Sequence, residues 1–183
     1  IEDTNSVLDT TNAYICNSRP RRFGKSYAAN MLAAYYSKGT DSEQMFSGLR
    51  ISKDADFKKH LNKYDVIHLD IQWFLANCED KNKVVQFITK SVLDELREIY
   101  PECLVLQDGS LSDALSRVKN QTGQKFVIII DECDVLIRDE AQNQAVQENY
   151  INFLRGLFKG TEPTKYIALA YLTGILPIKK MKT

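Results

Sequence analysis

Three consecutive residues near the amino terminus have the types that bind phosphate. Gly24, Lys25 and Ser26 follow a short apolar segment and precede a helical pattern, which is the setting of a phosphate-binding loop. Gly24 would let the backbone approach an anion closely, because it has no Cβ atom. Lys25 would neutralise the β- and γ-phosphates, and the Ser26 hydroxyl would ligate Mg²⁺. The triplet therefore predicts a site for a nucleoside triphosphate with Mg²⁺.

The start of this loop departs from the usual pattern G-x-x-x-x-G-K-S/T. Arg19 stands where the first glycine is expected, and Pro20 favours an extended backbone at Arg19. A left-handed conformation there would cost a non-glycine residue roughly 1–2 kcal/mol. We therefore expect a differently shaped loop entry, with Arg21, Arg22 and Phe23 as further nucleotide contacts. A basic surface turn is the alternative interpretation of the triplet taken alone.

Two carboxylates follow the most apolar segment of the chain. Residues 126–130 form a continuous apolar run, typical of a strand that is buried on both faces of a parallel sheet. Asp131 would hold Mg²⁺, and Glu132 would polarise the water that attacks the γ-phosphate. Either carboxylate alone is more often the cap of a turn. The pair, in one chain with the glycine–lysine–serine triplet, indicates a Walker B motif.

Three further polar residues are weaker candidates. Thr173 ends an apolar run at 166–172 and would orient the attacking water or sense the γ-phosphate, although a threonine–glycine pair also simply ends strands. Asp134 is interpreted as a turn or helix cap rather than as a metal ligand. Asp70 ends another apolar segment and would either face the pocket or begin a turn.

The elements that must position these residues alternate between strand and helix. Apolar runs predict strands at 13–16, 65–69, 126–130 and 166–172. Apolar residues at helical spacing, with caps and prolines, predict helices at 26–37, 84–99, 110–118 and 141–158. This alternation predicts an α/β fold with a parallel sheet, in which ligands bind at the carboxyl edge of the strands.

The composition is that of one globular domain. The chain has 183 residues, of which 44% are hydrophobic and 26% charged. Its 24 basic and 24 acidic residues give zero net charge, which disfavours general binding to polyanions. The apolar runs are far shorter than the roughly 20 residues that span a bilayer, so no membrane association is expected. Four scattered cysteines indicate reduced thiols in a cytoplasmic protein, without a disulfide framework or a zinc site.

Several segments resemble the predicted AAA-ATPase-like family. Residues 18–26, with the sequence SRPRRFGKS, resemble that family's loop, which also lacks the first glycine. Residues 128–134 resemble its Walker B segment, in which an aromatic residue often stands in the place of Cys133. Residues 60–67 and 168–180 resemble two further stretches, so the likeness covers nearly the whole chain.

The resemblance implies a three-layer P-loop NTPase with a parallel sheet of order 5-1-4-3-2, and ATP with Mg²⁺ as its ligands. Family members are usually longer and often continue into a PD-(D/E)XK nuclease-like domain. Residues 1–183 are therefore expected to form a single ATPase core of a longer protein, with DNA as a partner through that domain. A homo-oligomer is also expected, and Arg138 or Arg155 could supply an arginine to a neighbouring copy, although each is more simply a surface residue.

These observations are compatible with three functions. The first is Mg²⁺-dependent ATP hydrolysis that drives a conformational change in an attached or partner domain, with Glu132, Lys25 and Thr173 as catalytic residues. The second is a nucleotide-gated binding or scaffold domain with negligible turnover, because Arg19 and Pro20 could spoil the geometry of the transition state. The third, a P-loop kinase, is disfavoured because a water-activating glutamate would be wasteful in a kinase.

Overall fold

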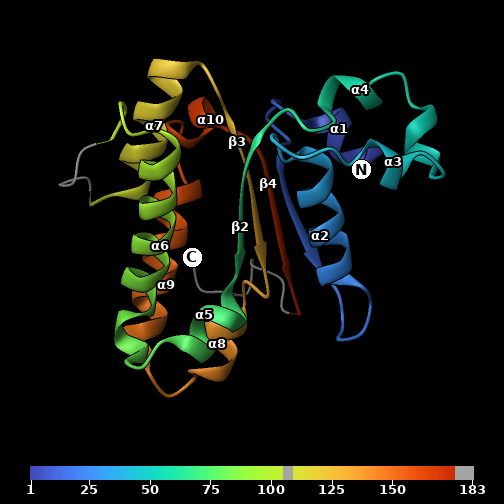
Figure 1. Ribbon diagram of the computed structural model, residues 1–183. Coiled ribbons are helices and arrows are strands. Elements are labelled where there is room, and N and C mark those ends of the chain that lie inside the picture. Colours follow the sequence, from blue (N-terminus) through green and yellow to red (C-terminus); the bar gives the residue numbers. More distant parts are fainter. Residues whose placement is uncertain (105–108, 176–183) are drawn as a thin grey trace.

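The computed structural model describes residues 1–104 and 109–175. A single parallel sheet lies between two layers of helices (Figure 1). The sheet has the order β1-β4-β3-β2, so β4 and β3 are its inner strands. The expected α/β class with a parallel, helix-flanked sheet is confirmed. The strands are β1 (Tyr14–Ser18), β2 (Asp65–Asp70), β3 (Phe126–Asp131) and β4 (Ile167–Gly174).

The helices divide between the two faces of the sheet (Figure 1). One face carries α1 (Glu2–Val7), α2 (Lys25–Tyr36), α3 (Glu43–Phe46) and α4 (Phe57–His60), with the 3-10 turn η1 (Arg50–Lys53). The other side carries α5 (Ile71–Asn77), α6 (Val84–Ile99), α7 (Leu111–Thr122), α8 (Val135–Asp139), α9 (Gln144–Phe158) and α10 (Pro163–Tyr166), with the 3-10 turn η2 (Lys81–Lys83).

The expected strand order 5-1-4-3-2 is not matched. The described part of the chain supplies four strand-forming segments and no fifth, because it ends one residue after β4. The four strands lie in the order 1-4-3-2, which agrees with that part of the expected order. The fifth strand was implied by the resemblance alone, and no apolar run was assigned to it.

Several expected elements have different boundaries; the helix expected at 110–118, for example, continues to Thr122 as α7. The helix expected at 141–158 begins three residues later, as α9, since Asn143 Oδ1 accepts a hydrogen bond from Val146 N at 3.2 Å and so caps its start. The strand expected from Tyr166 begins one residue later, because Pro163 opens the short helix α10 before it. The short helices α1, α3, α4, α5 and α8 were not expected.

The core has one half on each face of the sheet, and β3 contributes to both. Successive side chains of a strand point to opposite faces. Val127 and Ile129 pack in the cluster that contains α2, whereas Ile128 and Ile130 pack in the cluster under α5–α9. Every residue of β3 is buried. The prediction that this apolar run is a strand covered on both faces is confirmed.

Two tyrosines fix the far end of α2. Tyr35 and Tyr36 are fully buried. The Tyr35 hydroxyl donates to the Phe57 carbonyl at 2.8 Å, and the Tyr36 hydroxyl lies 2.8 Å from Thr4 Oγ1. Burial raises the pKa of Tyr36 well above its usual value, so this hydroxyl stays protonated. These bonds hold the helix whose first residue is Lys25.

We expect Ile129→Ala to lower the free energy of unfolding by about 2–5 kcal/mol, because it leaves a cavity in the buried centre of the sheet. The matched control is Ile99→Ala on α6, where the side chain is 60% exposed and about 1 kcal/mol or less is expected. Urea unfolding followed by circular dichroism measures both values. Equal losses for the two variants would contradict this account of the core.

Candidate functional site

The carboxyl ends of all four strands meet at one edge of the sheet, where the arrowheads lie together in Figure 1. In the strand register, Asn17 of β1 lies beside Thr173 of β4, and Asp70 of β2 lies beside Asp131 of β3. The loop from β1 to α2 and the starts of α5 and α8 are at the same edge (Figure 1). The expectation that polar strand ends converge there is confirmed.

The loop between β1 and α2 takes its left-handed turns at Arg22 and Gly24, which have φ angles of 68° and 73°. Gly24 is the residue that caps the start of α2, where only glycine takes this conformation without a steric penalty. Arg19 is not among the described residues with positive φ, and its amide donates to the Gly174 carbonyl at 3.0 Å. The loop therefore begins against the end of β4 and needs no glycine at Arg19.

Lys25 joins the loop to the acidic residues that follow β3. Its side chain is only 4% exposed. The ammonium donates to the Pro20 carbonyl at 3.3 Å, and Nζ lies 3.9 Å from Glu132 Oε1. Two motifs that are far apart in the sequence therefore meet at one ion pair.

Asp131 is held by its neighbours through one carboxylate oxygen. The buried Thr173 hydroxyl donates to Asp131 Oδ1, and Glu132 N donates to the same oxygen at 3.1 Å. Glu132 N also lies 3.3 Å from Thr173 Oγ1. Within the described ranges, no hydrogen bond ends on Asp131 Oδ2. Thr173 thus orients Asp131 and the backbone of Glu132, and Asp131 keeps one oxygen for another partner.

The carboxylate of Glu132 lies near two cations. Besides the contact with Lys25, Glu132 Oε2 is 3.7 Å from Arg138 Nη1. The backbone of Glu132 is left-handed, with a φ of 51°, and its side chain is 23% exposed. A non-glycine residue in this conformation costs of the order of 1 kcal/mol, and such residues cluster at functional sites.

Asp134 differs from its expected role. It stands at the start of α8, but its side chain makes no capping bond. The side chain is fully buried instead, where Oδ2 accepts from Ile175 N at 3.1 Å and lies 3.3 Å from Arg138 Nη1. Sequence reasoning treated Arg138 only as a surface residue or a donor to another copy. The i,i+4 spacing of Asp134 and Arg138 in the sequence was the signal that could have predicted this ion pair.

The remaining candidates are the aspartate that ends β2, a buried cysteine and four exposed side chains. Asp70 Oδ1 accepts from Trp73 N at 3.0 Å, which confirms that Asp70 begins a turn by capping α5. Burial raises the pKa of Cys133 far above its usual range, so this thiol is not a nucleophile. Four predicted nucleotide contacts are exposed on the loop and the first turn of α2: Arg21, Arg22, Phe23 and Ser26. The structure thus leaves these four side chains accessible to a ligand.

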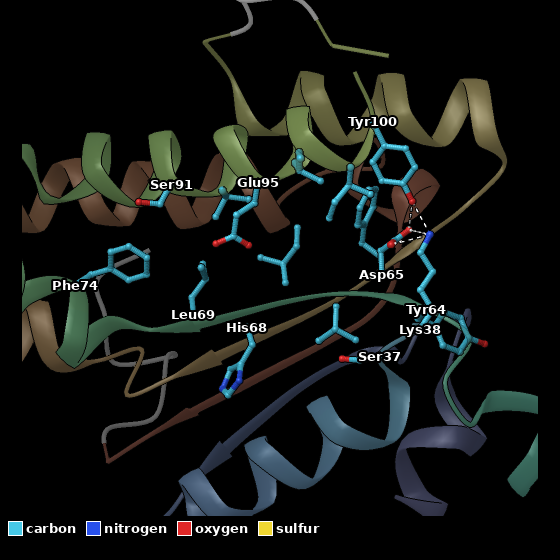
Figure 2. A pocket seen from close by; sticks show the side chains of 16 residues that line it. Ser37, Lys38, Tyr64, Asp65, His68, Leu69, Phe74, Ser91, Glu95 and Tyr100 are labelled. Atoms are coloured by element: carbon cyan, nitrogen blue, oxygen red, sulfur yellow. Dashed lines mark hydrogen bonds and ion pairs between the residues drawn. The ribbon is translucent and has the colours of Figure 1, made fainter. Parts of the chain in front are cut away.

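A cavity lies away from this site. It has a volume of about 220 Å³ and runs along β2, between that strand and α6 (Figure 2). One end is closed by polar contacts of Lys38, whose Nζ lies 2.8 Å from Asp65 and 2.6 Å from the Tyr100 hydroxyl. None of the residues of the two predicted motifs lines it. The cavity is therefore separate from the candidate site at the carboxyl edge of the sheet.

We expect Gly174→Ala to destabilise the protein by about 1–3 kcal/mol, because its Cβ would lie 2.8 Å from Asp134 Oδ1 and 3.3 Å from Cys133 Sγ. Gly156→Ala in α9 is the matched control. Its Cβ meets nothing within 4 Å, and alanine there should stabilise by about 0.5–1 kcal/mol. Urea unfolding measures the free energy of unfolding of both variants, which should fall for Gly174→Ala and rise for Gly156→Ala. A neutral Gly174→Ala would refute the close packing of β4 on Asp134.

Comparison with known proteins agrees with this geometry. A family model described as AAA-ATPase-like, predicted AAA-ATPase, matches residues 4–183, which include both motifs. Comparisons with curated proteins and with solved structures gave no match. In the described part of the chain, no helix is long and apolar enough to cross a membrane. Because the family model spans nearly all of its residues, this chain belongs to the AAA-ATPase-like family of predicted AAA-ATPases.

Proposed function

We propose that this protein binds ATP with Mg²⁺ and hydrolyses it. The observation that carries the proposal is the contact between Lys25 Nζ and Glu132 Oε1 at 3.9 Å. A phosphate-binding lysine and a water-activating glutamate must lie at the same site if both are to act on one γ-phosphate. Membership in the AAA-ATPase-like family supports the same function at a coarser level.

The triphosphate would bind at the start of α2. Amides of the loop and of the first helical turn, together with the helix dipole, favour an anion at this position. The Lys25 ammonium would move from the Pro20 carbonyl to the β- and γ-phosphates. Arg21, Arg22 and Phe23, which are exposed beside it, would line the entry of the nucleotide.

Two oxygens of the chain would hold the metal ion. Mg²⁺ bound with a nucleotide takes only one or two ligands from the protein, and the rest come from phosphates and water. The described residues contain no group of three or more His, Cys, Asp and Glu side chains that could hold a metal, so the nucleotide and water would have to supply most of the ligands. The Ser26 hydroxyl in the first turn of α2 and Asp131 Oδ2 would be these oxygens, since the hydrogen bonds to Asp131 end on Oδ1. The ion would neutralise the charge that develops on the phosphate oxygens.

The reaction would be the attack of water on the γ-phosphorus. Glu132 would take a proton from that water, the new P–O bond would form, and the bond to ADP would break. Lys25 would stabilise the charge on the phosphates throughout the step. Thr173 would act by fixing Asp131 and the backbone of Glu132, to which it is hydrogen-bonded.

The wider role of the protein is proposed from the family resemblance. Residues 1–183 would form the single ATPase core of a longer cytoplasmic protein, and hydrolysis would drive a conformational change in an attached or partner domain. A PD-(D/E)XK nuclease-like domain that acts on DNA, and a homo-oligomer, are the partners that the resemblance implies.

We expect Lys25→Ala to weaken the binding of Mg·ATP by at least about 30-fold, equivalent to the ~2 kcal/mol of a charge-assisted hydrogen bond. Titration calorimetry measures the Kd. The control is Lys90→Ala on α6, whose side chain is 77% exposed and pairs with Asp94; it should bind as wild type does. Unchanged binding by the Lys25 variant would reject the loop as a phosphate site.

We expect Glu132→Gln to lower the rate of phosphate release by about 10²–10⁴-fold and to leave Mg·ATP bound, because it removes the proton acceptor and leaves the phosphate-binding groups of the loop in place. The control is Glu98→Gln, an exposed substitution on α6. Equal turnover by Glu132→Gln and wild type would reject the assigned role. Tight binding with no turnover by wild type, also in the full-length protein, would favour a nucleotide-gated scaffold instead.

A further inference from the structure

The proposed function leaves one charged side chain at the site without a role. Glu132 Oε1 lies 3.9 Å from Lys25 Nζ, and Glu132 Oε2 lies 3.7 Å from Arg138 Nη1. Among the described residues, these are the two cations in contact with the Glu132 carboxylate. Lys25 is assigned to the phosphates, whereas Arg138 has no assigned partner in the reaction.

Arg138 is itself held in place. It comes from α8, which begins at the carboxyl edge of the sheet directly after β3 (Figure 1). Its Nε donates to Asp139 Oδ1 at 2.9 Å, and its Nη1 lies 3.3 Å from Oδ2 of the buried Asp134. Burial opposes the charge, but the neighbouring carboxylates outweigh it and raise the pKa of Arg138. The guanidinium is therefore a fixed and permanent positive charge beside Glu132.

A bound triphosphate would change the balance between these contacts. The phosphates would draw Lys25 away from Glu132, because they carry more negative charge than one carboxylate. Arg138 would then be the remaining cation in contact with Glu132. Without it, the Glu132 carboxylate would either swing into solvent or compete with the phosphates for Lys25.

We propose that Arg138 is a positioning residue, which holds the carboxylate of Glu132 toward the attacking water and keeps it from pairing with Lys25. This inference rests on the proposed function. Arg138 does not need to touch the nucleotide, and it acts within its own chain. Its effect on binding and on turnover must therefore depend on the presence of Glu132.

A double-mutant cycle tests this dependence. We expect Arg138→Gln to lower kcat by about tenfold or more and to raise the Kd for Mg·ATP by about threefold to tenfold. In the Glu132→Gln background, the same substitution should change neither quantity by more than about twofold. Arg138→Lys keeps the charge and should recover part of kcat. Phosphate release and titration calorimetry supply the two readouts.

The matched control is Arg97→Gln on α6. Arg97 has the same 21% exposure as Arg138 and also pairs with an aspartate of its own helix, Asp94. The Arg97→Gln substitution should leave kcat and Kd unchanged, since α6 carries no residue of the site. If Arg138→Gln fails to fold, the cycle is run with Arg138→Lys.

The outcomes separate this inference from the proposed function. If Arg138→Gln acts equally in both backgrounds, or has no effect while wild type hydrolyses ATP, the inference is overturned and the proposed function stands. If wild type binds Mg·ATP without turnover, the proposed hydrolysis fails, and the cycle on Kd alone decides the role of Arg138. Failure of wild type to bind Mg·ATP would overturn both.

Discussion

The contact between Lys25 and Glu132 is the interaction on which the candidate site depends. It joins a loop to the central strand, and it sets two opposite charges about 4 Å apart beside the start of a helix. At the dielectric typical of a protein surface, such a pair attracts by about 4 kcal/mol, from which the cost of burying Lys25 must be subtracted. The net stabilisation from this ion pair is therefore modest. In the proposed function, a triphosphate with its greater charge would therefore replace Glu132 as the partner of Lys25.

The rest of the structure makes this contact possible by fixing both of its ends. Asp131 and Glu132 follow a strand that is buried on both faces, and Thr173 on the neighbouring strand binds both residues. On the other side, α2 is held by its buried tyrosines at the end far from the loop. The loop itself exposes Arg21, Arg22 and Phe23. In the proposed function, the proton-accepting Glu132 and the metal-binding Asp131 therefore follow a rigid strand, and the nucleotide would enter past the loop.

Much of this arrangement follows from the sequence, because its signals are local. The apolar run of β3 predicted a strand covered on both faces, and the two motifs predicted a common edge of the sheet. The role of Asp134 could not be predicted, since its backbone partner Ile175 lies 41 positions away on the end of β4. Short helices such as α1 were missed for the same reason: Thr4 in α1 lies against the Tyr36 hydroxyl of α2, which no local pattern reveals. The fifth strand was taken from the resemblance, and the described segments contain no counterpart for it.

The end of β4 links the two acidic groups of the site. Thr173 binds Asp131 through its hydroxyl, and two residues later the amide of Ile175 binds Asp134, the buried partner of Arg138. Gly174 between them is packed so closely on Asp134 that a Cβ would not fit. This three-residue stretch therefore cannot shift without moving Asp131 or the carboxylate that holds Arg138. Conversely, a change at either carboxylate acts on the same stretch of backbone, so the end of β4 connects Asp131 with the residue that holds Arg138.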